Sequence, residues 1–196
     1  MATVAAQTVT DIEKRLARIE ARHEIENLIA RYGRACDDRD TQGVADLFTE
    51  DGVFGTKNGA SDAHGPAEIF ELFNTRYHAM GISYHWSHDR LIEFPHEDLS
   101  SATGVIFSHI EAVIDGKALL GGARYYDEYR CDDGVWRFRK RELHFLYFTP
   151  AEAYADTLTG ELRMTGLGQD APADFPETLD SWKNWTTKQY VAPSNR

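Results

Sequence analysis

The sequence is poor in cysteine and has no long apolar run. Its 2 cysteines, Cys36 and Cys131, form no CxxC motif, which argues against a disulfide scaffold and suits a reducing compartment. No segment approaches the length of a membrane-spanning helix, and residues 1–10 lack the basic and apolar regions of a signal peptide. We therefore expect a cytoplasmic protein without a membrane partner.

The sequence also lacks the motifs that hold nucleotides, metals or nucleophiles. It contains no GxGxxG or P-loop motif for a nucleotide, and no HxH or HExxH motif for a metal. His85 and His88 are three residues apart, which places them on opposite faces of a regular strand. Neither Cys36 nor Ser83 lies in a recognisable nucleophile turn. We expect no metal and no cofactor, so that side chains alone carry the chemistry.

Positive charge is scarce. The chain has 21 Lys and Arg against 32 Asp and Glu, a net charge of −11, and the scattered acids argue against nucleic acid as a partner. A chain of 196 residues with 42% hydrophobic residues can fill one core, and no Pro/Ser-rich or single-charge tract divides it. We expect one catalytic domain, residues 1–150, followed by a tail, residues 151–196.

Helical patterns dominate the first half of the chain. Residues 10–13 (TDIE) have the form of a capping box and begin an amphipathic pattern that predicts a helix over residues 10–36. Asp40 can cap a second, short helix, and residues 50–52 predict a turn before a brief strand at residues 53–55. Pro66 fits the first turn of a third helix. The first half therefore predicts three helices.

The second half changes to strand patterns. Residues 83–94, 102–114, 118–130 and 134–148 alternate or are rich in β-branched and aromatic residues, and short turn signals separate them. Four such strands predict an antiparallel meander. Three helices and a curved sheet form an α+β fold with a pocket on the concave side. The tail contains Trp182 and Trp185 and is expected to pack on the domain, on a neighbouring subunit or over the pocket mouth.

The strongest candidates for chemistry are an aspartate and a histidine. A carboxylate that orients an imidazole is a common general base near neutral pH, and Asp37 with His85 could form this pair, although Asp38 and Asp40 are rivals of Asp37. Tyr32 precedes Asp37 by five residues, so the two can converge on one cavity only if the helix ends near Ala35.

The pattern around the arginines on the last predicted strand is ambiguous. Arg137, Arg139 and Arg141 alternate, which by itself indicates a solvated face of the sheet. Alternation therefore does not place Arg141 inside the pocket.

Several segments between residues 15 and 150 carry a family resemblance. They are Arg31-Tyr32 with Asp37-Asp38-Arg39-Asp40, residues 47–52, His85 with Ile92-Glu93-Phe94, Tyr129 with Gly134-Val135-Trp136-Arg137-Phe138, and residues 147–150. They resemble the SnoaL-like, scytalone-dehydratase-like group of the NTF2-like superfamily, with its bile-acid dehydratases and hexachlorocyclohexane dehydrochlorinases. The resemblance implies an α+β cone of three helices on a strongly curved sheet.

The resemblance also implies roles for individual residues. Asp37 and His85 would form the catalytic dyad, Tyr32 would be a catalytic tyrosine and Arg141 a pocket arginine. His109 corresponds to a strand histidine of related dehydratases and would bind substrate. From their aromatic character, Tyr84, Phe107 and Tyr147 are expected to supply apolar walls of the pocket.

These residues predict a carbon–oxygen lyase. A phenol at Tyr32, where the dehydrochlorinase has lysine or glutamine, suits a departing hydroxyl better than a departing chloride. We expect a dehydratase acting on a small, hydrophobic, hydroxylated cyclic substrate, keto-steroid-like or aromatic-derived. Alternatives are a dehydrohalogenase, a ketosteroid-isomerase or cyclase-type enzyme, and a non-catalytic ligand-binding module or dioxygenase small subunit. The resemblance further implies a homo-oligomer, with a trimer first.

Overall fold

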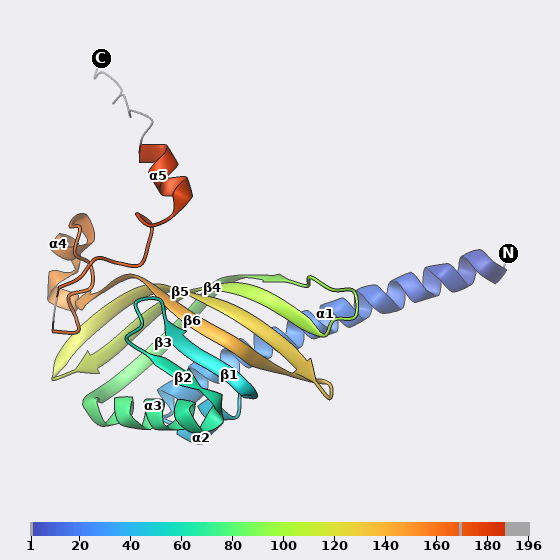
Figure 1. The fold of residues 1–196 in the computed structure, drawn as a ribbon, viewed down its shortest axis with the longest axis horizontal. Coiled ribbons are helices and arrows are strands. Elements are labelled where there is room, and N and C mark those ends of the chain that lie inside the picture. The colour runs from blue at the N-terminus through green and yellow to red at the C-terminus, as the bar shows by residue number, and fades with distance from the viewer. Residues whose placement is uncertain (1, 169, 187–196) are drawn as a thin grey trace, which may run out of the picture.

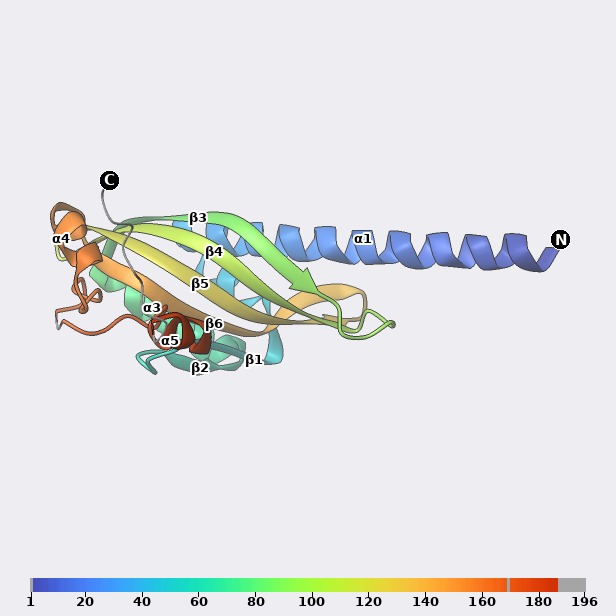
Figure 2. The same cartoon turned by 90° about the horizontal axis from the view of Figure 1, so that it is seen from above.

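The structure, a computed structural model, describes residues 2–168 and 170–186, with side chains described for residues 10–168 and 170–185 (Figures 1 and 2). The helices and strands before the tail are α1 (Ala2–Asp37), α2 (Thr41–Ala45), β1 (Phe48–Thr56), β2 (Asp62–His64), α3 (Gly65–Ala79), β3 (Met80–Glu93), β4 (Ser101–Ile114), β5 (Lys117–Asp132) and β6 (Val135–Pro150). The tail contains η1 (Ala151–Ala153), α4 (Tyr154–Thr159) and α5 (Asp180–Thr186).

The strands form one curved sheet in the order β2-β1-β6-β5-β4-β3. The predicted antiparallel meander is confirmed as β3 to β6, and Asp115-Gly116 and Asp133-Gly134 turn with positive φ angles, as tight hairpins require. The sheet extends beyond the predicted meander, because β1 pairs with β6 in parallel and β2 adds a short antiparallel edge. Residues 50–52, predicted as a turn, lie inside β1.

The helices α1, α2 and α3 lie on one side of this sheet (Figure 1), and the expected α+β fold is confirmed. Asp40 caps α2 as predicted, since its Oδ1 accepts a hydrogen bond from the backbone N–H of Gly43 at 2.9 Å. The predicted start of the first helix near Thr10 is wrong. The helix begins at Ala2, because residues 2–9 include several alanines, which favour helix, and no residue that stops it.

The two halves of α1 have different surroundings. The C-terminal half packs against the sheet with a buried stripe: Ala21, Ile25, Leu28, Ile29, Tyr32, Ala35 and Cys36. The N-terminal half projects beyond the sheet (Figure 2), and Ile12, Leu16 and Ile19 are exposed. No helix among the described residues is long and apolar enough to span a membrane.

Two bulges in β6 decide which of its side chains face the helices. Arg139 is an extra residue opposite the Glu128/Tyr129 step, and Leu146 is an extra residue opposite the Gly122/Ala123 step. Each bulge reverses the alternation of the strand. Arg141 therefore joins Phe138 on the inner face.

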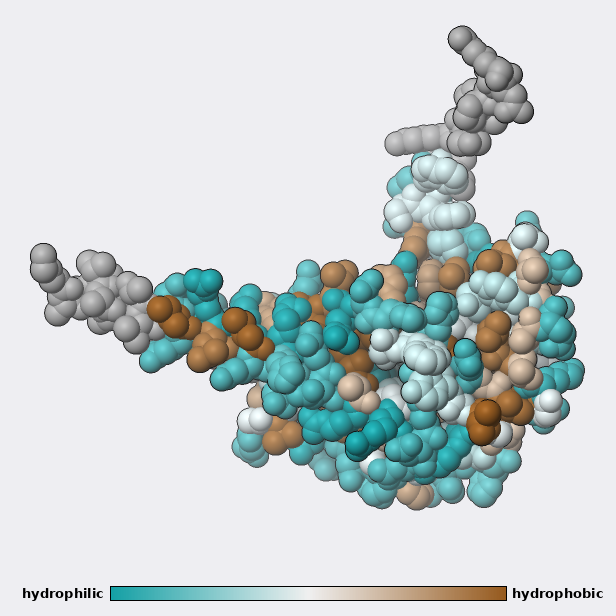
Figure 3. All heavy atoms as spheres, turned by 180° about the vertical axis from the view of Figure 1, so that it is seen from behind, coloured by the Kyte–Doolittle hydropathy of each residue, from teal (hydrophilic) through white to brown (hydrophobic). Residues whose placement is uncertain are grey.

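The tail returns to the sheet beside β6. The backbone N–H of Phe148 donates to the carbonyl of Arg163 at 2.9 Å, and the N–H of Phe145 donates to the Asp174 carboxylate at 2.7 Å. Met164 and Phe175 are buried there, whereas Trp182 and Trp185 of α5 are exposed. The last described part of the tail projects from the rest of the surface (Figure 3).

Candidate active site

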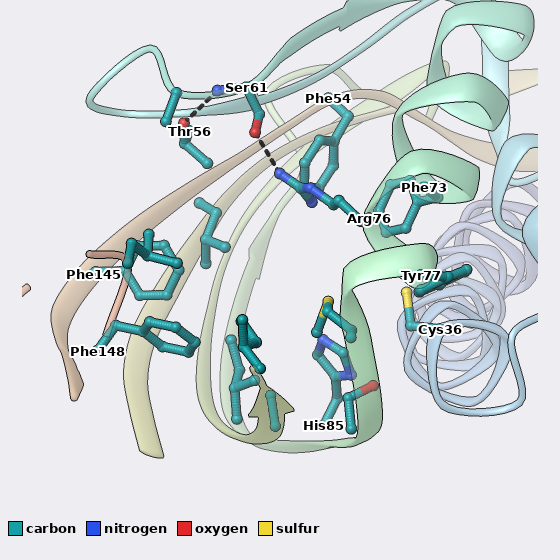
Figure 4. Close-up of a pocket in the computed structure, with 18 of the residues that line it drawn as sticks. Cys36, Phe54, Thr56, Ser61, Phe73, Arg76, Tyr77, His85, Phe145 and Phe148 are labelled. Atoms are coloured by element: carbon teal, nitrogen blue, oxygen red, sulfur yellow. Dashed lines mark hydrogen bonds between the residues drawn. The ribbon is translucent and has the colours of Figure 1, made fainter. Parts of the chain in front are cut away.

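A cavity of about 370 Å³ lies between α1, α3 and the concave face of the sheet (Figure 4). Its walls are mostly apolar, formed by Phe54, Phe73, Ile110, Leu143, Phe145 and Phe148. Its polar lining includes Tyr32, Cys36, Arg76, Ser83 and His85. Leu167 of the tail also contributes to the lining. An apolar cavity with a few converging polar groups is the usual form of a small-molecule site.

Asp37 and His85 are in direct contact. Asp37 is the last residue of α1, and its Oδ1 lies 2.7 Å from Nδ1 of His85 on β3. The other carboxylate oxygen accepts a hydrogen bond from the backbone N–H of His85 at 3.1 Å. Both side chains are 15% exposed. The carboxylate thus holds Nδ1 as the protonated ring nitrogen and leaves Nε2 as the basic one.

Tyr32 reaches the cavity by a different route from the one expected. Helix α1 continues to Asp37 and does not end near Ala35. Tyr32 lines the cavity, whereas Asp37 is not one of its lining residues and is linked to it by its contact with His85. The Tyr32 ring lies edge-on to the His85 ring, with centroids 6.4 Å apart. Burial raises the pKa of the Tyr32 phenol well above its ordinary value, since a phenolate would lose its hydration. Tyr32 therefore remains a hydrogen-bond donor.

Arg141 faces inward but does not line the cavity. It is 1% exposed and forms a bidentate ion pair with Asp127, which lies directly opposite on β5, at 2.9 and 2.8 Å. Its guanidinium lies 4.2 Å from the Tyr32 ring centroid and 4.3 Å from that of Tyr125. Burial alone would lower the pKa of Arg141, but the Asp127 carboxylate outweighs this and raises it. Arg141 therefore sits one layer beneath the cavity, with its charge already neutralised.

The four expected substrate-binding residues lie outside this cavity. On β4, the even-numbered residues face the helices, so Phe107 and His109 point to the other face, where His109 Nδ1 lies 3.0 Å from His88 Nε2. Tyr84 alternates with the inward His85 and lines a shallow groove between α1 and β3. The bulge at Leu146 sends Tyr147 to the outer face, against Tyr154. The placement of all four in the pocket is therefore corrected.

Several polar lining residues were not predicted, among them Arg76, Ser83 and Cys36. Arg76 follows Phe73 by three residues on α3, so the helical period could have indicated that both face the cavity. Ser83 shares the inner face of β3 with His85, and its buried hydroxyl has no hydrogen-bond partner among the described residues. Cys36 is buried beside Tyr32, and burial raises the pKa of its thiol to about 12.

The described part of the chain contains no group of three or more His, Cys, Asp or Glu side chains arranged to hold a metal ion. His88 and His109 contact each other on the outer face of the sheet, apart from His85. The groups of the described lining that can act on a substrate therefore include the His85 imidazole, backed by Asp37, the Tyr32 phenol and the Arg76 guanidinium.

Known proteins share this arrangement of helices and sheet. The SnoaL-like domain family matches residues 17–142. Gamma-hexachlorocyclohexane dehydrochlorinase from Sphingobium indicum is 29% identical over 136 residues, which cover 69% of this chain and 86% of that protein. The crystal structure of LinA superposes with a TM-score of 0.66 at 25% identity, covering 70% of this chain and 93% of that chain.

A more distant structure supports the fold alone. A scytalone-dehydratase-like protein from Novosphingobium aromaticivorans superposes with a TM-score of 0.62 at 20% identity, covering 71% of this chain and 91% of that one. The expected family and its curved α+β fold are thus confirmed, while the roles of individual side chains remain predictions.

Proposed function

Because the chain belongs to the SnoaL-like domain family, we propose that it is a cofactor-independent lyase that eliminates water from a small cyclic substrate. The observation that carries this proposal is the His85 ring in the cavity, held by Asp37 through a 2.7 Å contact at Nδ1. This arrangement suits proton abstraction by Nε2, and the adjacent carboxylate would stabilise the imidazolium that forms. Relatives named as dehydrochlorinases also support elimination chemistry.

The proposed reaction begins at a carbon next to a carbonyl group. His85 Nε2 removes a proton from this carbon, and the electron pair of the broken C–H bond forms a C=C bond as the neighbouring C–O bond breaks. The leaving hydroxyl takes up the proton from His85 and departs as water. Tyr32 donates a hydrogen bond to the leaving oxygen and keeps its own proton, because burial raises its pKa. His85 is then neutral again.

The cavity supports a small substrate. Its volume of about 370 Å³ lies near the lower end of the range of small-molecule sites, roughly 300–1,000 Å³. This favours a one- or two-ring, aromatic-derived compound over a complete steroid. The aromatic walls Phe54, Phe73 and Phe145 suit a flat apolar ring.

A search for conjugated products tests the proposal. One- and two-ring β-hydroxyketones would be incubated with the protein and monitored for the ultraviolet absorbance of an enone. We expect turnover that falls about 10²- to 10⁴-fold in His85→Gln and Asp37→Asn. His88→Gln is the matched control, because this histidine lies on the outer face. Turnover that survives both dyad substitutions would contradict the mechanism, whereas no turnover by the wild type would favour a non-catalytic module.

Dehydrochlorination is a second candidate, favoured by the 29% identity to gamma-hexachlorocyclohexane dehydrochlorinase. Tyr32 argues against it, since a neutral phenol stabilises a departing chloride less than a cation does. Chloride release from hexachlorocyclohexane, measured beside the enone assay, separates the two. Faster chloride release than water elimination would replace our proposal with this one.

We also propose that the chain forms a homo-oligomer. The outer face of β3 exposes large apolar side chains, Ile82, Tyr84, Trp86 and Leu91, which supports an interface there. Light scattering after size-exclusion chromatography would give the number of subunits, with a trimer expected. A monomer at micromolar concentration would contradict this proposal.

A further inference from the structure

Arg76 brings a positive charge into the cavity from α3. Its guanidinium donates a hydrogen bond to the Ser61 hydroxyl and lies over the rings of Phe54 and Phe73, at 5.2 and 5.4 Å from their centroids (Figure 4). Ser61 is 9% exposed, and Arg76 is half-buried at the cavity wall. These contacts fix the direction of the side chain without neutralising its charge.

Three arginines on the sheet or in the tail have acidic partners. Arg141 pairs with Asp127, Arg163 pairs with Glu177, and Arg130 pairs with Asp51. Arg76 forms no ion pair within the described part of the chain, and the described residues that line this cavity include no Asp or Glu. A cation that leaves water without a partner is costly. The missing partner is best supplied by whatever occupies the cavity.

We propose that Arg76 and Ser61 bind a carboxylate group of the substrate. A guanidinium presents parallel N–H groups that match the two oxygens of a carboxylate, and one cation balances its single negative charge. The Ser61 oxygen accepts the hydrogen bond from Arg76, so its own hydrogen is free to donate to the ligand. A phosphate dianion carries two negative charges, of which the single cation of Arg76 would balance only one. The substrate class is therefore a cyclic keto acid.

The positions of the two polar groups assign different tasks to them. Arg76 and His85 lie at different parts of the cavity wall, on α3 and β3 (Figure 4). The carboxylate is thus an anchor, and the carbon that reacts is held toward His85. This inference rests on the proposed function for its claim that the cavity is the active site. The binding of the carboxylate itself does not depend on the reaction.

Paired small molecules test the anchor directly. The probes are 4-oxocyclohexane-1-carboxylate and the neutral 4-oxocyclohexane-1-carboxamide, whose affinities are measured by calorimetry or by ligand-observed NMR. We expect the carboxylate to bind roughly ten- to a hundredfold more tightly than the carboxamide, as for a charged hydrogen-bonded pair in a cavity. Arg76→Met should remove this preference, and Arg76→Lys should keep part of it.

Control variants separate the outcomes. Arg15→Met removes one positive charge from an exposed part of α1 and should leave the preference unchanged. Thermal unfolding of Arg76→Met shows whether the variant is folded. Equal affinity of the wild type for both probes, no binding of either, or a preference that persists in Arg76→Met would each overturn the proposal.

The proposed reaction can fail independently of the anchor. His85→Gln should bind the carboxylate as tightly as the wild type does. If no lyase activity is found but the preference depends on Arg76, the anchor stands and the reaction is wrong. If enones form from neutral and acidic substrates at equal KM, the reaction stands and the anchor is wrong.

Discussion

Two arginines near the candidate site differ in what surrounds their charge. Arg141 lies beneath the cavity, 1% exposed, with both oxygens of Asp127 within 2.9 Å of its guanidinium. Arg76 lies in the cavity wall, with a serine hydroxyl and two aromatic faces as its partners. One charge is satisfied by the fold itself. The other remains available to a ligand.

The comparison shows that depth alone does not make an arginine functional. The Arg141–Asp127 pair supports the underside of the site, because the guanidinium packs under Tyr32 and Tyr125 and Tyr129 donates a hydrogen bond of 2.7 Å to Asp127. Removing a partner there leaves an unpaired charge in the core. Removing Arg76 leaves a cavity that is more apolar. The two substitutions should therefore affect different measurements.

The largest expected effect is the loss of stability in Asp127→Ala. This variant leaves Arg141 buried without a counter-charge, which costs about 3–5 kcal/mol of unfolding free energy. Urea unfolding followed by circular dichroism measures this loss. Asp132→Ala is the control, since Asp132 is partly exposed and pairs with Arg130 at the surface. Equal unfolding free energies of the two variants would show that the Arg141–Asp127 pair does not stabilise the fold more than the surface pair does.

The double variant Asp127→Leu/Arg141→Met sharpens this test. It removes both charges together, so it should be more stable than either single variant. Strict additivity of the two single losses would mean that the two side chains do not act as a pair.

An intermediate effect is expected at alkaline pH from Cys36, which lines the same cavity as Arg76. Burial raises the pKa of its thiol to about 12 from an ordinary value of 9.0, and hydrogen bonding with Tyr32 and Tyr77, with a smaller contribution from the charge of Arg141, offsets this in part. The folded state therefore binds more protons than the unfolded state above pH 9. The contribution to stability is complete below about pH 9 and is lost toward pH 12, by about 1.4 kcal/mol per pH unit.

Urea unfolding between pH 8 and pH 11 checks this slope. Cys36→Ala should lose less stability than the wild type over this interval. Tyr32 and Tyr125 contribute in the same direction, because burial raises the pKa of both phenols, and they remain in the variant. Identical pH dependence in the two proteins would mean that the Cys36 thiolate is not destabilised by burial.

The smallest expected effect is that of Arg76→Met on stability. Methionine keeps the apolar contacts with Phe54 and Phe73 and loses one hydrogen bond to Ser61, so the unfolding free energy should fall by less than about 1.5 kcal/mol. The same urea titration measures it beside Asp127→Ala. A loss as large as that of Asp127→Ala would make both arginines structural and end the contrast between them.

The sequence predicted the meander well because its signals are local. Alternation defines β4, β5 and β6, and Asp-Gly pairs fix the hairpins. The parallel pairing of β1 with β6 was missed because it joins segments far apart in the chain. Pro66 located the start of α3, whereas the predicted start of the first helix lies eight residues after its start in the structure.

The site was predicted less completely than the fold. The resemblance paired Asp37 with His85, and the two are in contact. Strand alternation was a poor guide to the residues of the cavity wall where β6 has bulges. The extra residues Arg139 and Leu146 turn Arg141 inward and Tyr147 outward. Arg76 was overlooked because an arginine on an amphipathic helix is usually solvated. Its significance depends on tertiary contacts with Ser61 and Phe54.

The most direct test of the central claim is hydrogen–deuterium exchange at carbon. Proton NMR in deuterated buffer would follow the protons next to the carbonyl of 4-oxocyclohexane-1-carboxylate, which has no leaving group. Exchange accelerated by the wild type and by His88→Gln, and reduced at least about a hundredfold in His85→Gln, is the predicted result. Exchange that is equally fast in His85→Gln, or that the wild type does not accelerate, would contradict the assignment of His85 as the base.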